Sequence, residues 1–267
     1  MSANPSNSRL LIGTSGYYYE DWRKVFYPPG LPNSEMLVYY ARHFNTVEIN
    51  ATYYKIPGIQ TFKRMETNTP DGFQFIVKTH QETTHRRIEN EASLTKLAAS
   101  VQPLIAAGKF SGYLAQFPYS FKNSEKNRKY LVETKQMIGE HPLFVEFRNN
   151  SWIKKPLVDF LRQHQISYVN VDEPPLPGLL PAQDIVTSNA GYIRLHGRNQ
   201  KDWWQGKGSA RYDYNYEEDE LKEWLTNISN ILRKTFKTYI FFNNHPNGQA
   251  VKNAEQMIEI LKSKSLL

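Results

Sequence analysis

Ionisable and amide side chains follow short apolar runs at several places along the chain. Some come in pairs two residues apart, as Glu48 and Asn50 do, so that both members point to one face of an extended strand. The set comprises Glu48, Asn50, Lys78, Gln116, Glu146, Arg148, Asp172, Arg194, His196, Asn243, Asn244 and His245. A charge embedded in an apolar strand costs several kcal/mol unless it is paired or solvated. We therefore predict that these groups converge on a common pocket.

The residue types in this set suit acid–base chemistry on a negatively charged molecule. Carboxylates and imidazole are common general acids and bases, so we expect proton transfer by Glu146, Asp172 and His196. The cations would bind an anion or stabilise negative charge that develops during a reaction. The residues expected to bind and orient the substrate are Glu48, Asn50, Lys78, Gln116, Arg148, Arg194, Trp203, Trp204, Asn243, Asn244 and His245.

Two other interpretations of the same residues stay open. A purely structural ring of ion pairs would join Glu146 to Arg194 and Asp172 to Arg148. Carboxylates and imidazoles are also ligands for divalent metal ions. Three carboxylates already face three fixed cations, so a metal ion has little electrostatic demand here. We predict a pocket without a metal or another cofactor.

A long polar loop at 197–212 follows the seventh apolar run. It holds four cations against one aspartate, together with the paired Trp203 and Trp204. Aromatic faces interleaved with Arg and Lys bind sugars or nucleobases by stacking and cation–π contact. We expect this loop to cover the pocket, although the tryptophans could simply pack the loop onto the body. The alternating Tyr212, Tyr214 and Tyr216 are interpreted as a structural stripe.

The segment 243–248, after the last apolar run, has Asn and Gly residues that suit a tight turn before a helix. Backbone N–H groups at such a turn often bind phosphate in β/α barrels. The sequence leaves a phosphate site and a plain strand-to-helix turn as alternatives.

The elements that position these residues are eight β-rich runs that alternate with helical patterns. Continuous apolar runs are typical of parallel strands covered by helices. The expected strands lie at 9–14, 46–54, 73–79, 113–117, 143–148, 167–172, 192–196 and 239–243. We predict an α/β fold, a single (β/α)8 TIM-type barrel over 9–267, preceded by a disordered tail at 1–8. Four prolines between the sixth and seventh runs disfavour a regular helix there, so we expect that helix to be absent or irregular.

Composition narrows the class of protein further. The 267 residues carry a formal net charge of +7, which favours anionic partners. The absence of cysteine excludes disulfides, thiolate metal sites and a cysteine nucleophile. No apolar run approaches the ~18 residues of a membrane span, and the first eight residues lack the apolar core of a signal peptide. We expect a cytoplasmic protein that does not bind membranes.

An ordered set of short motifs resembles the domain-of-unknown-function 72 (YecE-like) family. The motifs are Gly13-Thr14-Ser15-Gly16, Phe44-Asn45-Thr46-Val47-Glu48-Ile49-Asn50, Gln116-Phe117-Pro118, Val145-Glu146-Phe147-Arg148, Tyr192-Ile193-Arg194-Leu195-His196-Gly197 and Phe242-Asn243-Asn244-His245. The resemblance spans roughly residues 9–255. It implies a single TIM-type barrel from a family without an assigned reaction, so it supplies no catalytic residues.

Three functions follow from these observations. The first is an enzyme that acts on a small anionic or sugar-like substrate by acid–base or hydrolytic chemistry. The second is a protein that binds nucleic acid or cleaves phosphodiesters with the basic loop 197–212 as an arm, for which binding should weaken steeply with salt. The third is a non-catalytic scaffold that binds a ligand without converting it. The sequence favours no particular oligomeric state.

Overall fold

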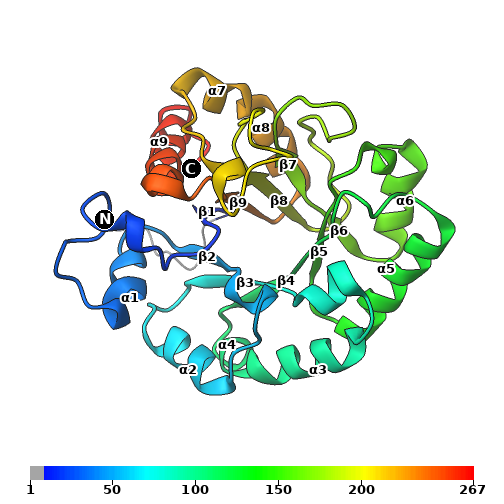
Figure 1. Ribbon diagram of the computed structural model, residues 1–267, viewed down its shortest axis with the longest axis horizontal. Coiled ribbons are helices and arrows are strands. Elements are labelled where there is room, and N and C mark those ends of the chain that lie inside the picture. Colours follow the sequence, from blue (N-terminus) through cyan, green and yellow to red (C-terminus); the bar gives the residue numbers. More distant parts are fainter. Residues whose placement is uncertain (1–8) are drawn as a thin grey trace.

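The computed structural model describes residues 9–267, so the tail expected at 1–8 lies outside the described residues. The strands lie around the centre of the molecule with the helices outside them (Figure 1). The strands are β1 (Leu10–Thr14), β2 (Thr46–Ile49), β3 (Gln74–Lys78), β4 (Phe110–Gln116), β5 (Leu143–Glu146), β6 (Ile166–Tyr168), β7 (Asn170–Asp172), β8 (Ala190–Leu195) and β9 (Lys237–Phe242). The run expected at 167–172 is divided into β6 and β7 at Val169.

The fold is α/β with two parallel sheets. Their strand orders are β1-β9-β8-β7 and β2-β3-β4-β5-β6. The two sheets adjoin where Ser15, after β1, forms a parallel bridge with Glu48 of β2. They adjoin again between the consecutive strands β6 and β7, where Val169 N–H donates to the oxygen of Val145 over 3.0 Å. The carboxyl ends of all nine described strands therefore face the same way.

The helices shield the outer faces of the sheets, which explains the unbroken apolar runs. They are α1 (Met36–Tyr40), α2 (Ile59–Thr67), α3 (Asn90–Ser100), α4 (Gln102–Ala106), α5 (Glu125–Ile138), α6 (Lys155–Gln163), α7 (Glu218–Glu223), α8 (Leu225–Lys234) and α9 (Gln249–Ser263). The helical pattern around Pro103 divides into α3 and α4, because proline tolerates only the first turn of a helix. Residues 173–189 contain no helix, as their prolines predict. Within residues 9–267, no helix is long and apolar enough to span a bilayer.

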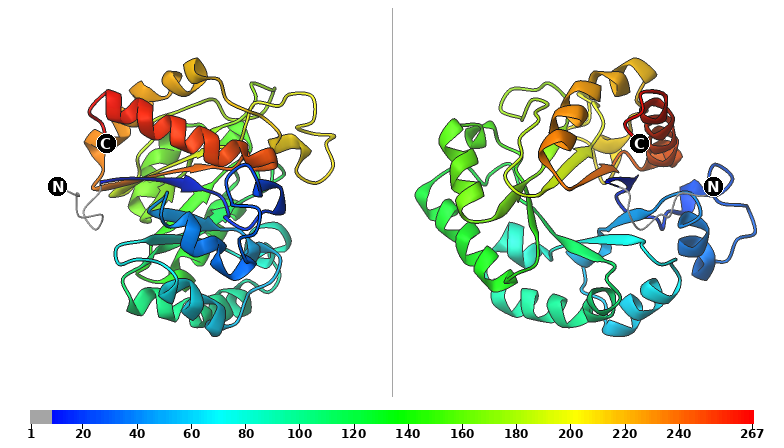
Figure 2. Two further views of the ribbon diagram at one scale, coloured as in Figure 1. Left: turned by 90° about the vertical axis from the view of Figure 1, so that its left-hand side faces the viewer. Right: turned by 180° about the vertical axis from the view of Figure 1, so that it is seen from behind.

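Two glycines shape the end of the molecule where the strands finish. A Cβ on Gly13 would lie 2.2 Å from the backbone oxygen of Thr46, so glycine allows β1 to approach β2 closely. Gly197 has a φ of +90° and turns the chain out of β8 into the loop 197–212. This loop, yellow in the left view of Figure 2, projects beyond the strands on the side away from the C terminus.

Candidate functional site

A pocket of about 670 Å³ opens at the carboxyl ends of the strands. Its walls come from the segments that follow β1, β2, β3, β4, β5, β7 and β9, from the last residues of β3, β4 and β8, and from the loop 197–212. The residues that line it include Tyr19, Asn50, Tyr53, Tyr54, Lys78, His85, Gln116, Tyr119, Arg148, Arg194, Trp203, Trp204, Arg211, Tyr212, Asn243 and His245. Four of the described lining residues carry fixed positive charge or an amine, and none is a carboxylate.

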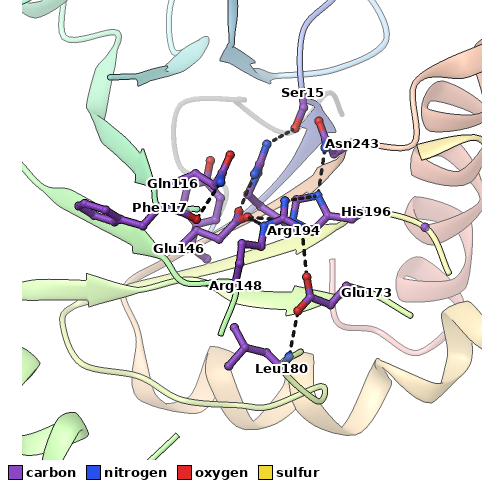
Figure 3. A network of polar contacts seen from close by, with 12 residues as sticks. Ser15, Gln116, Phe117, Glu146, Arg148, Glu173, Leu180, Arg194, His196 and Asn243 are labelled. Carbon is purple, nitrogen blue, oxygen red and sulfur yellow. Dashed lines mark hydrogen bonds and ion pairs between the residues drawn. The ribbon is translucent and has the colours of Figure 1, made fainter. Parts of the chain in front are cut away.

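Glu146 lies beneath the pocket and joins its two floor arginines (Figure 3). Arg194 Nη1 donates to Glu146 Oε2 over 2.5 Å, and Arg148 Nε lies 2.6 Å from Glu146 Oε1. Glu146 is fully buried, and Arg194 is only 1% exposed. Despite its burial, the two guanidinium groups hold the pKa of Glu146 well below its usual value, so the carboxylate is ionised.

Two further carboxylates complete the charge balance of the floor. Arg194 Nη2 donates to Glu48 Oε1 over 2.7 Å, and Tyr192 donates its hydroxyl to Glu48 Oε2 over 2.5 Å. Arg148 Nη1 donates to Glu173 Oε2 over 3.0 Å. These contacts immobilise both guanidinium groups and fix where their positive charge meets the pocket.

His196 is held among these charges and has no exposed surface. Its Nδ1 lies 3.0 Å from the amide nitrogen of Asn243 and 3.4 Å from Arg148 Nη2, which are both donors. Nδ1 is therefore an acceptor, and the ring hydrogen sits on Nε2, 3.2 Å from Glu146 Oε1. Burial and the charge of Arg148 lower the pKa of His196 to about 3, so the ring is neutral. The ring of His196 therefore contacts Glu146, Arg148 and Asn243 and has no surface open to the pocket.

Lys78 and His85 are titratable groups that do face the pocket. Lys78 Nζ donates to Gln116 Oε1 over 3.0 Å and lies 4.9 Å from the centre of the Tyr53 ring. The pKa of Lys78 is lowered to about 8, mainly by burial and secondly by the positive charge of Arg194. The pKa of His85 is lowered to about 4, mainly by burial and secondly by the positive charge of Lys78. His85 is therefore neutral at neutral pH, and a minor fraction of Lys78 is neutral as well.

Aromatic side chains form much of the upper wall. The ring of Trp203 is buried and lies 5.5 Å from the Arg148 guanidinium. Trp204 is 50% exposed and packs edge-on against Tyr119. His245 stacks on Tyr19 with 4.5 Å between the ring centres. Trp203 thus anchors the loop 197–212, whereas Trp204 presents a free face at the mouth.

The structure brings together most of the residues predicted to form the site. Nine of them line the pocket, namely Asn50, Lys78, Gln116, Arg148, Arg194, Trp203, Trp204, Asn243 and His245. Glu48, Glu146 and His196 lie directly beneath and contact the arginines. Asp172 and Asn244 do not join them.

Asp172 points toward the helices instead of the pocket. It accepts hydrogen bonds from the Arg198 guanidinium, the Tyr216 hydroxyl at 2.7 Å and the Trp224 indole at 2.7 Å. The expected pair between Asp172 and Arg148 is therefore not formed, and Glu173, the next residue, takes that place. Asn244 is likewise turned outward, because its amide donates to Asn253 and to the backbone of Tyr214.

Several lining residues escaped the sequence analysis. The strand expected at 46–54 ends at Ile49, and a 3-10 turn, Ala51–Tyr53, carries Tyr53 to the pocket wall. His85 lies on a single π-helical turn, Glu82–Arg86, which no periodic pattern in the sequence marks. Tyr212 lines the pocket, so it is not part of a purely structural stripe, whereas Tyr214 and Tyr216 pack against each other.

The described residues contain no group of three or more His, Asp or Glu side chains placed to hold a metal ion. The carboxylate oxygens of Glu146 and Glu48, which lie nearest the pocket floor, contact the side chains of Arg148, Arg194 and Tyr192.

Comparison with known proteins places this chain in a family. The model of the family described as "Protein of unknown function DUF72" matches residues 11–266. The chain belongs to the DUF72 family. The UPF0759 protein YunF of Bacillus subtilis (strain 168) is 31% identical to this DUF72 chain over 272 residues, which cover 94% of each protein.

Two solved DUF72 structures resemble the chain over almost its whole length. A DUF72 family protein from Thermotoga maritima is 40% identical, with a TM-score of 0.88, and the match covers 96% of this chain and all of that one. A DUF72 family protein from Enterococcus faecalis is 26% identical, with a TM-score of 0.81, over 96% of this chain and 99% of that one. The names of these DUF72 relatives state no reaction or ligand.

Proposed function

We propose that this DUF72 chain is an enzyme that binds a small anionic, sugar-like substrate in the pocket and converts it by acid–base chemistry. The observation that carries the proposal is the composition of the described pocket wall. Lys78, Arg148, Arg194 and Arg211 line it without any carboxylate. Such a wall attracts negative charge and repels cations.

The two floor arginines are suited to binding rather than to mere structural pairing. Each is fixed by buried carboxylates on the side away from the pocket, so its position is set before a ligand arrives. Preorganised guanidinium groups bind carboxylate or phosphate with little loss of side-chain entropy. Arg211 makes no ion pair with any described residue and adds a cation from the loop 197–212.

The aromatic rim supports a sugar-like substrate. Tyr54 is 75% exposed and Trp204 is 50% exposed, and both line the mouth of the pocket. Flat apolar faces beside amide groups such as those of Asn50 and Gln116 suit the alternating C–H and O–H surface of a sugar. Lys78 and His85 line the pocket and are the groups that we propose for proton transfer, in place of Glu146, Asp172 and His196, which do not line it.

We propose in addition that the two sheets close into one eight-stranded (β/α)8 barrel, with β6 and β7 counted as one strand. The Ser15–Glu48 bridge and the continuity of β6 with β7 support this closure. A closed barrel would hold the strand ends that supply the pocket in fixed register.

Binding of a charged ligand tests the proposal without knowledge of the natural substrate. We expect inorganic phosphate and glucose 6-phosphate to raise the melting temperature of the protein, and glucose alone to have a smaller effect. Arg211→Gln should weaken the response to both anions. Lys201→Gln removes the same charge from an exposed position in the same loop that does not line the pocket, so it is the matched control. Equal responses in the two variants, or none in the wild type, would refute anion binding at this pocket.

The nucleic-acid alternative has less support from the geometry. Arg198 is tied to Asp172, and Trp203 is buried, so neither is available to a strand of nucleic acid. Binding to DNA or RNA that weakens steeply with salt and is lost in Lys201→Gln would favour it over the pocket proposal.

A further inference from the structure

Lys78 at the end of β3 and Lys109 just before β4 differ sharply in their surroundings. Lys109, which precedes β4 and is buried, donates to the backbone oxygens of Glu66 and Thr69 at 2.7 Å and to Thr69 Oγ1 at 3.3 Å. All three of its hydrogens have acceptors. Lys78, at the end of β3, has one acceptor, the neutral amide oxygen of Gln116. No described carboxylate contacts its ammonium group. The surroundings of Lys109 therefore satisfy all of its side-chain hydrogen bonds, whereas those of Lys78 satisfy only one.

Burial and the nearby arginines disfavour the protonated form of Lys78, and the charges of Glu48 and Glu146 offset this effect only in part. Arg194 and Arg148 stand on the same pocket floor, and their carboxylate partners lie on the side away from the pocket. Together with burial they lower the pKa of Lys78 to about 8, so roughly a tenth of the amine is neutral at pH 7 and about half at pH 8. A neutral amine has a free electron pair and is a nucleophile toward carbonyl carbon. Lys78 is partly exposed to the pocket, which leaves room for that attack.

Building on the proposed function, we infer that Lys78 is a catalytic nucleophile and that the substrate is an anionic carbonyl compound, such as a keto acid or a phosphorylated ketone. The anionic group binds Arg148, Arg194 and Arg211 while the carbonyl carbon meets Lys78 Nζ. The new C–N bond forms as the carbonyl electron pair moves to oxygen, and a proton passes from nitrogen to that oxygen. The resulting carbinolamine loses one water molecule and becomes an imine. No oxidant or reductant takes part.

The surroundings of Lys78 contain a group for these proton transfers. His85 lines the same pocket, and its ring lies 5.0 Å from the ring of Tyr53, over which Lys78 is placed. The neutral His85 ring can accept the proton that leaves the nitrogen and return it to the departing hydroxyl group. Glu146 and His196 lie beneath the floor, where His196 Nε2 is 3.2 Å from Glu146 Oε1, and neither is needed for the step.

Reductive trapping tests this inference on the full chain. The protein is incubated with pyruvate or dihydroxyacetone phosphate in the presence of sodium cyanoborohydride, which reduces an imine to a stable secondary amine. Peptide mass mapping should place one adduct on Lys78 of the wild type and none on Lys109. Acetone, a carbonyl compound without charge, should label Lys78 less at the same concentration. Lys78→Arg keeps a cation but should lose the adduct.

The pH dependence separates Lys78 from adventitious lysines. Labelling of Lys78 should rise with pH and level off above about 8, because the amine is then neutral. An exposed lysine with an ordinary pKa would continue to gain reactivity up to about 10. Labelling spread over surface lysines, or a rise that continues to pH 10, would overturn the inference even if Lys78→Arg were unstable.

The outcome also separates this inference from the proposed function. A phosphate-dependent rise in melting temperature without any Lys78 adduct would leave anion binding in place and overturn the nucleophile. Equal labelling of Lys78 by acetone and by the anionic compounds would overturn the anionic substrate class. The inference stands if phosphate competes with pyruvate for labelling of Lys78.

Discussion

Glu146 and Asp172 are buried carboxylates at the ends of strands β5 and β7, yet they hold together different parts of the molecule. Glu146 meets Arg148, Arg194 and His196 beneath the pocket. Asp172 accepts hydrogen bonds from the side chains of Arg198, Tyr216 and Trp224 on the outer side of the strands. Burial, charge and position at a strand end are the same in both cases. Only the face of the strand decides which carboxylate supports the pocket.

The two networks therefore support different components of the proposed site. Glu146 fixes the arginines that present charge to a ligand. Asp172 fixes the start of the loop 197–212, because Gly197 N–H donates to the Tyr216 hydroxyl, which donates in turn to Asp172. One network places charge, and the other places the loop above it.

The largest expected effect comes from Glu146→Ala. The substitution leaves two buried guanidinium groups without a shared partner, and we expect a loss of about 3–5 kcal/mol in the free energy of unfolding. Urea unfolding followed by circular dichroism measures this loss. Glu133→Ala is the control, because Glu133 forms only an exposed pair with Lys129 and should cost less than about 1 kcal/mol. Similar losses in the two variants would contradict the role assigned to Glu146.

Asp172→Ala should have a smaller effect on stability and a local effect on the loop. Tyr216 and Trp224 would lose a buried acceptor, but Arg198 keeps Glu223 at 2.9 Å, so we expect a loss of about 1–3 kcal/mol. Hydrogen exchange should accelerate in residues 197–212. Glu146→Ala should leave the exchange of that loop closer to the wild type. If both variants loosen the loop equally, the two networks are not separate.

The fold was largely predictable because helices cover the strands from outside. The apolar runs at 9–14 and 143–148 correspond to β1 and β5 within a few residues, and the prolines of 173–189 correctly excluded a helix. The split of one helical pattern beside Pro103 also follows from a local rule. The runs were extended too far where a strand passes directly into a polar turn, as β2 does after Ile49.

The site was harder to predict where two polar residues are adjacent. Asp172 and Glu173 differ by one position, and so do Asn243 and Asn244, yet one member of each pair faces the pocket region and the other faces the helices. A shift of one residue reverses the face of a strand, and the sequence does not show where the strand ends. His85 depends on a π-helical turn, whose geometry leaves no periodic signal.

Acidification should lower the free energy of unfolding through His196, which belongs to the network beneath the pocket. The folded protein holds the pKa of His196 near 3, whereas the unfolded chain takes up the proton near 6.5, so this group's contribution to stability is lost as pH falls below 6.5. Glu173 acts in the opposite sense, because burial raises its pKa to about 7. The useful quantity is therefore the difference between wild type and His196→Gln. Between pH 7 and 5.5 the wild type should lose roughly 1 kcal/mol more than the variant in urea unfolding. An unchanged difference would mean that His196 takes up its proton over the same pH range in the folded and unfolded states.

The smallest effect on stability is expected at Trp204. Its neighbour Trp203 lies in the same loop, 197–212, but is buried, so the two residues can be compared directly. Trp203 is buried against Arg148, so Trp203→Ala should lower the free energy of unfolding by about 3–5 kcal/mol. Trp204 is half-exposed, so Trp204→Ala should lower it by less than about 1 kcal/mol.

Trp204 should matter instead for the binding of ligands that have a ring. Its loss should weaken glucose 6-phosphate binding by about 0.5–1.5 kcal/mol, measured by calorimetry, and leave inorganic phosphate unchanged. Phosphate needs only the charges on the floor, whereas a sugar ring also needs a face at the mouth. A parallel loss for both ligands would mean that Trp204 acts through the position of the loop and not through contact with the sugar.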